Sequence, residues 1–318
     1  MNEISKRKWK VLTLPCLFCS VVHEANAFLG ISSPGFDKMK SSNNKIYDLH
    51  LLKLKSSSRI LREYDLETDF GNDWPFNDEV DFQRLDEEED SEFYSKPRMV
   101  QHIDEWAVLS LRSYYDEELS SLPSDIKILD LCSSWTCNYP NGNLNDEGTM
   151  EKRRTVIGVG MNEEELSSNE QLDSYYVQDL NLNPLLSSLE DGSFDVVTMA
   201  LSVDYLTRPK EVFQEIHRVL KPGGTALIPI SNRYFRTKAI QKWLETKDDQ
   251  KRLDIVANYI HYSEKWKSIQ ARDIKLETSF ENIQQFVGNQ NLFKWFATAI
   301  FRGTWATDPL YVVKAMKK

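Results

Sequence analysis

SFDVVTMALSVDYLTRPKEVFQEIHRVLKPGGTALIPISN, residues 193–232, contains a complete strand–helix–strand unit. Its first apolar run, residues 194–200, is short and does not alternate with polar residues, as expected of a strand buried on both faces. The next segment predicts a helix, because apolar residues recur with a 3.6-residue period at Val212, Phe213, Ile216, Val219 and Leu220. The sequence KPGG at 221–224 is predicted to end this helix, with a glycine in the left-handed cap conformation. A second strand is predicted from Thr225, which completes one βαβ unit of a parallel sheet.

Further strands are predicted on both sides of this unit. Short apolar runs bounded by polar clusters occur at residues 127–132, 155–160, 175–179 and 311–317. Strands that alternate with helical segments predict an α/β fold with a Rossmann-like, doubly wound and mostly parallel sheet and helices on both faces. Ligands of such sheets bind at the carboxyl ends of the strands. Pro229 is expected at an edge or a bulge, because proline cannot donate to a strand ladder.

Several segments together resemble a known enzyme family. In chain order, ILDL, VIGVGMNEEEL, VQDL, FDVVTMALSVDYL and EVFQEIHRVLKPGG resemble the class I S-adenosylmethionine-dependent methyltransferases over residues 92–318. The stretch from FDVV to HRVLKPGG is similar to the type-11 branch, which includes quinone C-methyltransferases. FYSKPRMVQHID, LDLCSSW, GMNEEEL and SVDYL resemble an uncharacterised plant and algal methyltransferase-like group. The resemblance implies a seven-stranded sheet, S-adenosyl-L-methionine as cofactor and methyl transfer as the reaction.

The same resemblance implies which residues hold the cofactor. Asp130, at the end of the first predicted strand, matches the acidic residue that orders the cofactor loop, and Asp179 matches the residue that meets the adenine amino group. The full implied set is Asp130, Cys132, Ser133, Ser134, Met161, Asn162, Asp179, Leu180 and Ser202. Two of these residues have structural alternatives: Asn162 forms a capping box with Glu165, and Asp179 is a candidate turn residue.

The chain departs from the family pattern at two positions. Family members have Gly-x-Gly-x-Gly after the first strand, because glycine lets the backbone approach the ligand closely. Residues 132–136 of this chain are CSSWT and contain no glycine. The family's ribose-binding acid falls on Gly160. These departures motivate an alternative hypothesis, a catalytically inactive methyltransferase-fold protein with a binding or regulatory role. A nicotinamide oxidoreductase is discounted, because Glu163 replaces the third glycine of a dinucleotide motif that would begin at Gly158.

No single residue is marked as a general base by the sequence. Methyl transfer is a displacement at a sulfonium, so the protein supplies orientation and, where the acceptor carries a proton, a nearby base. The candidates are His102 and Asp104 on a predicted N-terminal lid helix, Asp204 after the fourth strand, and His261 in the insert 235–265. Each has the alternative of being an ordinary solvated side chain, and His217 is predicted to be part of the scaffold. Core and lid packing is also favoured over a substrate-pocket wall for the aromatic residues Trp243, Tyr259, Tyr262, Trp266, Phe286, Phe293, Trp295 and Phe296.

The N-terminal region is basic, unlike the rest of the chain. Residues 1–62 carry 11 Lys/Arg against 4 Asp/Glu, so they contribute +7 to a net charge of −10 and leave −17 for the remainder. Basic residues precede the apolar run 11–22 and the small-residue triplet 25–27, which predicts a signal peptide over 1–27. A membrane anchor is disfavoured, because this run falls short of the ~20 apolar residues needed to span a bilayer. A Ser- and Lys/Arg-rich transit-peptide-like segment over 28–62 completes a bipartite presequence, which predicts the plastid stroma, with secretion as the alternative.

Residues 63–92 are strongly acidic, with 14 Asp/Glu and one Arg. They are interpreted as a solvated linker that leads to a methyltransferase-like domain at 93–318, with a docking tail for a basic partner as the alternative. An acidic surface repels phosphate backbones, so a small-molecule substrate is favoured over nucleic acid. Only Cys132 and Cys137 lie beyond the predicted signal peptide, so neither a disulfide framework nor a structural zinc site is predicted.

Overall fold

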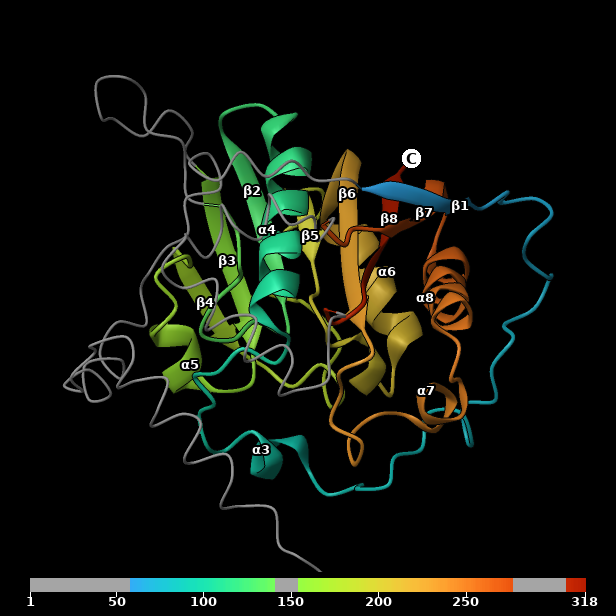
Figure 1. Cartoon of the computed structure of the whole chain (residues 1–318), viewed down its shortest axis with the longest axis horizontal. Coiled ribbons are helices and arrows are strands. Elements are labelled where there is room, and N and C mark those ends of the chain that lie inside the picture. The colour runs from blue at the N-terminus through green and yellow to red at the C-terminus, as the bar shows by residue number, and fades with distance from the viewer. Residues whose placement is uncertain (1–57, 141–153, 277–306) are drawn as a thin grey trace, which may run out of the picture. The chain divides into compact units, whose positions relative to one another are not determined.

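One mixed β-sheet organises the domain (Figure 1). The structure, a computed structural model, describes residues 58–140, 154–276 and 307–318. The strands of these residues lie in the order β1-β7-β8-β6-β5-β2-β3-β4. Their bounds are β1 Arg59–Glu63, β2 Ile126–Leu131, β3 Arg154–Gly160, β4 Ser174–Val177, β5 Phe194–Thr198, β6 Leu220–Ser231, β7 Trp266–Asp273 and β8 Leu310–Lys317.

The doubly wound fold predicted from the sequence is confirmed. Strands β2 to β6 run parallel to one another, whereas β8 lies antiparallel between β6 and β7, and β1 pairs antiparallel with β7. The sheet of the described residues has eight strands rather than the seven implied, because β1 adds an edge strand. Neither β1 nor β7 was located by the sequence pattern.

Helices cover both faces of the sheet. They are α3 Asp90–Phe93, α4 Glu105–Ser120, α5 Glu163–Ser167, α6 Pro209–Val219, α7 Gln241–Glu245 and α8 Asp249–Ser263, with a 3₁₀ helix η2 at Val203–Tyr205. Successive residues of β2 point to opposite faces: Ile128 packs with Leu111 and Tyr114 of α4, and Leu129 belongs to the core cluster of α6 and α8. Figure 1 shows α4 in front of the sheet. The core is thus two apolar layers separated by the sheet.

The βαβ unit at 193–232 forms as predicted, with two differences at its second strand. Helix α6 ends at Val219, but Leu220 has an extended backbone and already pairs with Phe194, so no glycine caps the helix. Gly223 has a φ of +77° within β6 instead. Pro229 lies in the interior of the sheet rather than at an edge. The Pro229 carbonyl oxygen accepts a hydrogen bond from Leu201 N, which lies beyond the end of β5. Proline lacks an N–H, but the ladder between β5 and β6 has already ended at this point, so no ladder hydrogen bond is lost.

The acidic segment does not behave as a solvated linker, although most of its carboxylates are exposed. We refer to residues 64–102 as the strap. Its apolar residues Tyr64 and Phe82 are buried in the core, and Phe70, Trp74 and Phe76 pack against it. Backbone hydrogen bonds also join the strap to the chain around α7, from Gln241 N to Gln83 O and from Lys242 N to Asp81 O. In Figure 1 the strap leaves β1 and passes α7 and α3 before it reaches α5.

Other predictions meet the structure only in part. Residues 1–57 lie outside the described residues, and β1 occupies the end of the predicted transit segment. Trp243, Tyr259 and Trp266 are buried in the core as predicted, and Phe286, Phe293, Trp295 and Phe296 lie outside the described residues. His217 Nε2 donates to Lys265 O at 3.2 Å, and its ring packs on Trp266, which is the scaffold role predicted for it. In the described part of the chain, no helix is long and apolar enough to cross a bilayer.

Candidate functional site

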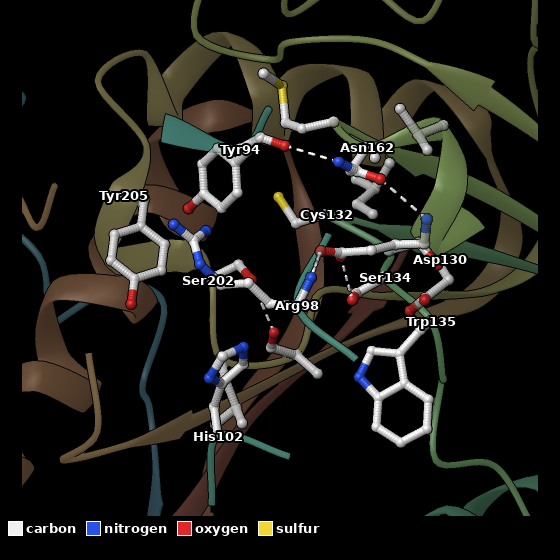
Figure 2. A pocket seen from close by; sticks show the side chains of 18 of the residues that line it. Tyr94, Arg98, His102, Asp130, Cys132, Ser134, Trp135, Asn162, Ser202 and Tyr205 are labelled. Carbon is white, nitrogen blue, oxygen red and sulfur yellow. Dashed lines mark hydrogen bonds between the residues drawn. The ribbon is translucent and has the colours of Figure 1, made fainter. Parts of the chain in front are cut away.

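A cavity of about 340 Å³ opens at the carboxyl ends of β2, β3, β4 and β5. This is the edge at which doubly wound sheets bind ligands, and the volume lies in the usual range of small-molecule sites. All nine residues implied as cofactor-binding line this single cavity. Trp135, which follows the loop serines, lines the cavity without closing it. Figure 2 shows Asp130, Ser134, Trp135 and Asn162 near one another on one side of the view.

The loop after β2 takes its turn without glycine. Cys132 adopts a φ of +53°, a left-handed conformation that costs an ordinary residue about 1–2 kcal/mol. The glycines that make room for the loop lie instead on the neighbouring strand β3. A Cβ on Gly160 would stand 2.2 Å from the Ser133 carbonyl oxygen, and one on Gly158 would stand 3.2 Å from Ser133 Oγ. The loop backbone therefore packs closely against β3, and the glycine that makes this possible lies on β3 rather than in the loop.

This arrangement also explains why the family's ribose-binding acid falls on a glycine. An aspartate or glutamate at position 160 would place its Cβ inside the Ser133 carbonyl. Ser133 N donates to Val159 O at 2.8 Å, so the loop cannot move away without losing a backbone hydrogen bond. The loop after β2 can therefore take this position only if residue 160 is not an aspartate or a glutamate.

Polar side chains from the segment after β3 hold the loop in place. Glu165 Oε2 accepts from Ser134 Oγ at 2.5 Å, and Asn169 Nδ2 donates to Ser134 O at 2.7 Å. Gln171 accepts from Cys137 N at 3.2 Å and donates to Tyr139 O at 2.9 Å. The loop is thus fixed from both ends, by Glu165, which the sequence analysis named only as a capping-box residue, and by Asn169 and Gln171, which it did not name.

Asp130 forms the buried centre of the cavity floor. Its Oδ1 accepts from Thr198 Oγ1 at 2.6 Å and from Tyr139 OH at 3.4 Å, and the Tyr139 and Thr198 hydroxyls lie 2.6 Å apart. Burial raises the pKa of Asp130, and the hydrogen bond from Thr198 opposes that rise. The role implied for Asp130, ordering the loop region, agrees with these contacts, because Tyr139 lies just beyond the loop.

Asn162 and Asp179 have the structural roles named as alternatives, although both also line the cavity. Asn162 Oδ1 accepts from Glu165 N at 3.0 Å and caps α5. The capping box is only half formed, because the Glu165 carboxylate bonds Ser134 and the backbone N of Arg98. Asp179 Oδ1 accepts from Asn181 N at 2.8 Å, which is a turn contact.

Only one of the four candidate bases reaches the cavity. His102 lines it, and burial lowers the pKa of the imidazole, so the ring is neutral at pH 7. Asp104 instead caps α4 by accepting from Ala107 N at 2.8 Å, and it does not line the cavity. Asp204 and His261 are also wrong as candidates for contact with a ligand: Asp204 is buried in η2, and His261 stacks on Phe70 at 4.0 Å.

The roof of the cavity comes from residues that the sequence analysis missed. Tyr94, Arg98 and Gln101 of the strap line it together with Tyr205 and Phe235. The strap is joined to the floor loop by Trp135 Nε1, which donates to Val100 O at 3.2 Å, and by Gln101 Nε2, which donates to Asn138 Oδ1 at 3.2 Å. One available signal was the mixture of aromatic and basic residues in FYSKPRMVQHID.

A buried ionic cluster anchors the roof. The Asp90 carboxylate, which is 6% exposed, accepts from Arg84 Nη1 at 2.7 Å and from Asn181 Nδ2 at 2.8 Å. Lys238, 1% exposed, lies 3.3 Å from the same carboxylate and donates to Glu88 O at 2.6 Å. Because a buried charge is stable only when it is paired, this cluster fixes the strap against the chain after β6.

The electrostatic potential of the floor is negative. Burial is the largest cause that raises the pKa of the Cys132 thiol to about 12, and the nearby carboxylates of Asp130 and Asp179 contribute to this rise. A negative potential at this point favours a cationic ligand. Among the residues that the structure describes, no group of His, Cys, Asp and Glu is arranged to hold a metal ion.

Comparison with known proteins supports a methyltransferase domain. Residues 143–228 match the family model described as "Methyltransferase domain". A segment of 39 residues is 44% identical to the ubiquinone/menaquinone biosynthesis C-methyltransferase of Ruegeria sp. (strain TM1040), which amounts to 12% of this chain and 16% of that protein. The chain therefore matches only about a sixth of the length of this curated relative.

Solved structures of low sequence identity are also similar to the chain. Phosphoethanolamine N-methyltransferase 2 of Haemonchus contortus, in complex with phosphomonomethylethanolamine and S-adenosylhomocysteine, is 16% identical, with a TM-score of 0.39 over 66% of this chain and 52% of its own. A SAM-dependent methyltransferase of Archaeoglobus fulgidus is also 16% identical, with a TM-score of 0.39 over 66% of this chain and 94% of its own.

Proposed function

We propose that this chain, whose domain belongs to the class I S-adenosylmethionine-dependent methyltransferases, transfers a methyl group to a small organic acceptor held in the cavity at the carboxyl ends of β2 to β5. The observation that carries the proposal is the convergence of all nine residues implied as cofactor-binding on that one cavity. S-Adenosylmethionine, when bound, supplies a methyl group on a positively charged sulfur. The residues of the chain position the reactants.

The floor of the cavity fits a cationic nucleoside ligand. Its potential is negative around Cys132, and it offers the Ser133 and Ser134 side chains and Asp179 beside the cavity. The loop is held by Glu165 and Asn169, so a ligand would meet a surface that is already ordered. Preorganised contacts of this kind reduce the entropy lost on binding. These features support S-adenosyl-L-methionine as the cofactor of this chain.

His102 is the residue we assign to proton removal where the acceptor carries a proton. It lines the cavity, its ring packs on Phe235 at 5.2 Å, and its lowered pKa keeps the imidazole able to accept a proton at neutral pH. No hydrogen bond to either ring nitrogen is recorded among residues 58–140, 154–276 and 307–318. A base of this kind contributes about 10²–10⁴-fold to a rate.

The alternative of an inactive binding module loses the observation that motivated it. That alternative arose from the absence of glycine in the loop after β2. Gly158 and Gly160 of β3 supply the space that loop glycines would otherwise provide, and a cavity remains beside the loop. The departure from the family pattern therefore has a structural explanation that leaves room for a ligand.

Isothermal titration of the full chain with S-adenosylhomocysteine tests the proposal. We expect a Kd in the micromolar range, and we expect Asp179→Ala to weaken it by about tenfold through loss of about one charged hydrogen bond. Asp125→Ala, at an exposed position outside the cavity, is the matched control and should bind as the native chain does. Absence of binding at millimolar ligand in a folded sample would contradict the proposal and favour the inactive module.

We further propose that the protein acts in the plastid stroma, on the strength of the bipartite presequence predicted for residues 1–62. A fluorescent reporter fused to residues 1–58 should accumulate in plastids, because this segment holds both the signal-like and the transit-like parts and stops before β1. A fusion to residues 1–27 alone should enter the secretory route. Secretion of the longer fusion would contradict the plastid assignment.

A further inference from the structure

Arg98 brings an uncompensated positive charge to the roof of the cavity. Among residues 58–140, 154–276 and 307–318, no carboxylate forms an ion pair with its guanidinium, whose one recorded hydrogen bond goes from Nη2 to Phe93 O at 2.9 Å. The other arginine of the cavity lining, Arg233, is paired with Asp308 at 2.7 Å. A half-buried guanidinium has five donors, so Arg98 retains donors for a ligand.

Aromatic rings surround this guanidinium. Arg98 Cζ lies 4.4 Å from the centre of the Phe93 ring, 5.4 Å from that of Phe235 and 5.8 Å from that of Tyr94. The Phe235 ring is in turn 5.2 Å from His102 and 6.0 Å from Tyr205. Figure 2 shows the Arg98 side chain extending toward Tyr94 and Tyr205, with His102 on the same side of the view. We call Tyr94, Arg98, His102, Tyr205 and Phe235 the roof cluster.

The members of the roof cluster are held in position before any ligand arrives. Arg98 N donates to Glu165 Oε1 at 2.6 Å, which fixes its backbone to the floor segment. Phe235 N donates to the Tyr205 hydroxyl at 2.8 Å, which ties the loop after β6 to η2. The cluster therefore combines a fixed cationic fork with flat apolar surfaces, both facing one cavity.

We propose that the roof cluster is the acceptor subsite and that it takes a planar aromatic or conjugated carboxylate, whose carboxylate binds Arg98 and whose flat body packs against Tyr94, Tyr205 and Phe235. This inference rests on the proposed function, because it supplies the acceptor for that methyl transfer. A guanidinium binds a carboxylate through two parallel hydrogen bonds, and aromatic rings pack on planar conjugated groups. No other group among the described residues competes with the ligand for the free side of Arg98.

The distribution of charge in the cavity makes this subsite specific. Of the remaining carboxylates of the lining, Asp130 and Asp179 lie on the floor side, after β2 and β4, and both oxygens of Glu165 in α5 are engaged, by Ser134 Oγ and by Arg98 N. Asp90 in the roof is already neutralised by Arg84 and Lys238. An anionic acceptor is thus repelled from the floor and attracted only near Arg98, which orients it. His102, neutral at pH 7, lies in the same cluster and can accept a proton from a second substituent of the acceptor.

The test compares carboxylic acids with their uncharged amides on the full chain loaded with S-adenosylhomocysteine. The probes are benzoate, 4-hydroxybenzoate and cinnamate, each paired with its amide, and binding is measured by saturation-transfer NMR and isothermal titration. We expect at least one acid to bind about tenfold or more tightly than its amide, because the amide loses a charged, bidentate contact. Equal binding of every acid and its amide would overturn the proposal.

Three variants test whether the acid-to-amide preference depends on the Arg98 side chain. Arg98→Gln should reduce the acid-to-amide preference to less than about twofold, and Arg98→Lys should retain part of it, because lysine keeps the charge and loses the planar fork. Arg208→Gln, an exposed arginine outside the cavity, should change nothing. Persistence of the full preference in Arg98→Gln would refute the assignment. Circular dichroism checks folding, and Arg98→Lys decides the matter if Arg98→Gln is unfolded.

Failure of this inference is distinguishable from failure of the proposed function. Affinity for S-adenosylhomocysteine is measured first for each variant, we expect it to be the same for the native chain and Arg208→Gln, and the acid preference of Arg98→Gln is then compared at saturating S-adenosylhomocysteine. Native binding of S-adenosylhomocysteine without acid preference would overturn the acceptor subsite alone. A chain that binds the acids through Arg98 but not S-adenosylhomocysteine would support an anion site and contradict the methyltransferase.

Discussion

The floor of the cavity consists of strand ends and loops of the parallel sheet, whereas the roof comes from the strap and from the chain after β6. The floor is held by hydrogen bonds, such as those from Asn169 to Ser134 O and from Ser134 Oγ to Glu165, and by close backbone packing at Gly160. The roof is held by buried charges at Asp90, Arg84 and Lys238. In the function proposed above, the cofactor is positioned by the rigid sheet, and the acceptor is recognised by a segment whose attachment depends on ion pairs.

Removal of the central roof carboxylate should have the largest effect. Asp90→Ala leaves Arg84 and Lys238 buried without their partner, and loss of one member of a buried ion pair costs about 3–5 kcal/mol. We expect lower resistance to urea and faster hydrogen exchange over residues 84–98. The control is Asp191→Ala, which removes an ion pair whose aspartate is 80% exposed and should cost less than about 1 kcal/mol. Equal effects of the two substitutions would show that the roof is not held by its buried charges.

The carboxyl group of Asp204, in η2 between floor and roof, should make stability depend on pH. Burial raises its pKa from 3.8 to about 8, and its Oδ2 has no partner among the described residues. Between pH 4 and pH 8 the folded protein therefore keeps a proton on Asp204 that the unfolded chain has lost. The free energy of unfolding falls as pH rises through this window, by at most about 1.4 kcal/mol per pH unit.

Asp204→Asn removes this penalty. The free energy of unfolding of the variant should exceed that of the native chain increasingly from pH 4 to pH 8 and by a constant amount above pH 8, as measured by urea denaturation. Asp125→Asn, at an exposed site, is the control and should follow the native profile. Parallel profiles for Asp204→Asn and the native chain would indicate that Asp204 is ionised throughout.

A methyl group added to the floor should disturb the loop directly. The Cβ of Gly160→Ala would lie 2.2 Å from Ser133 O, so the loop must shift, at a cost of about 1–3 kcal/mol for overpacking. We expect weaker binding of S-adenosylhomocysteine, with the acid preference of the roof cluster unchanged. Gly71→Ala is the control, since its Cβ meets only the Tyr262 hydroxyl at 3.5 Å. Native-like affinity in Gly160→Ala would mean that the loop position is unimportant for the ligand.

The smallest effect is expected where floor and roof meet. Trp135→Phe keeps the aromatic ring and removes the hydrogen bond from Nε1 to Val100 O, which is worth about 1 kcal/mol. Hydrogen exchange of residues 98–102 should become faster, while the midpoint of global unfolding changes little. Unchanged exchange in this segment would show that Gln101 and Glu165 suffice to hold the strap.

The sequence predicted the floor better than the roof for a physical reason. Strands β2, β3, β5 and β6 each contain a short apolar run, and the carboxyl ends of parallel strands meet at one edge of the sheet, which placed Asp130, Met161 and Ser202 together. Strand β7, WKSIQARD, has no such run, and β1 lies among basic residues. Both depend on neighbours that are remote in the sequence.

The sequence analysis misinterpreted the strap because acidic residues far outnumber the aromatic residues that pack in the core. Fourteen carboxylates dominate residues 63–92, yet the contacts are made by the few aromatic residues among them, such as Trp74 and Phe82. The direction of a single side chain was equally inaccessible. His102 and Asp104 are two residues apart, but one faces the cavity and the other caps α4.

Strand β1 has a consequence for maturation of the protein. It pairs antiparallel with β7 from Arg59 to Glu63, inside the region where the presequence was predicted to end. A processing protease that cut after this strand would leave the backbone donors and acceptors of β7 open to pairing with a second molecule, a known route to misassembly. Removal of the presequence before residue 58 would retain β1, which covers the backbone donors and acceptors of β7.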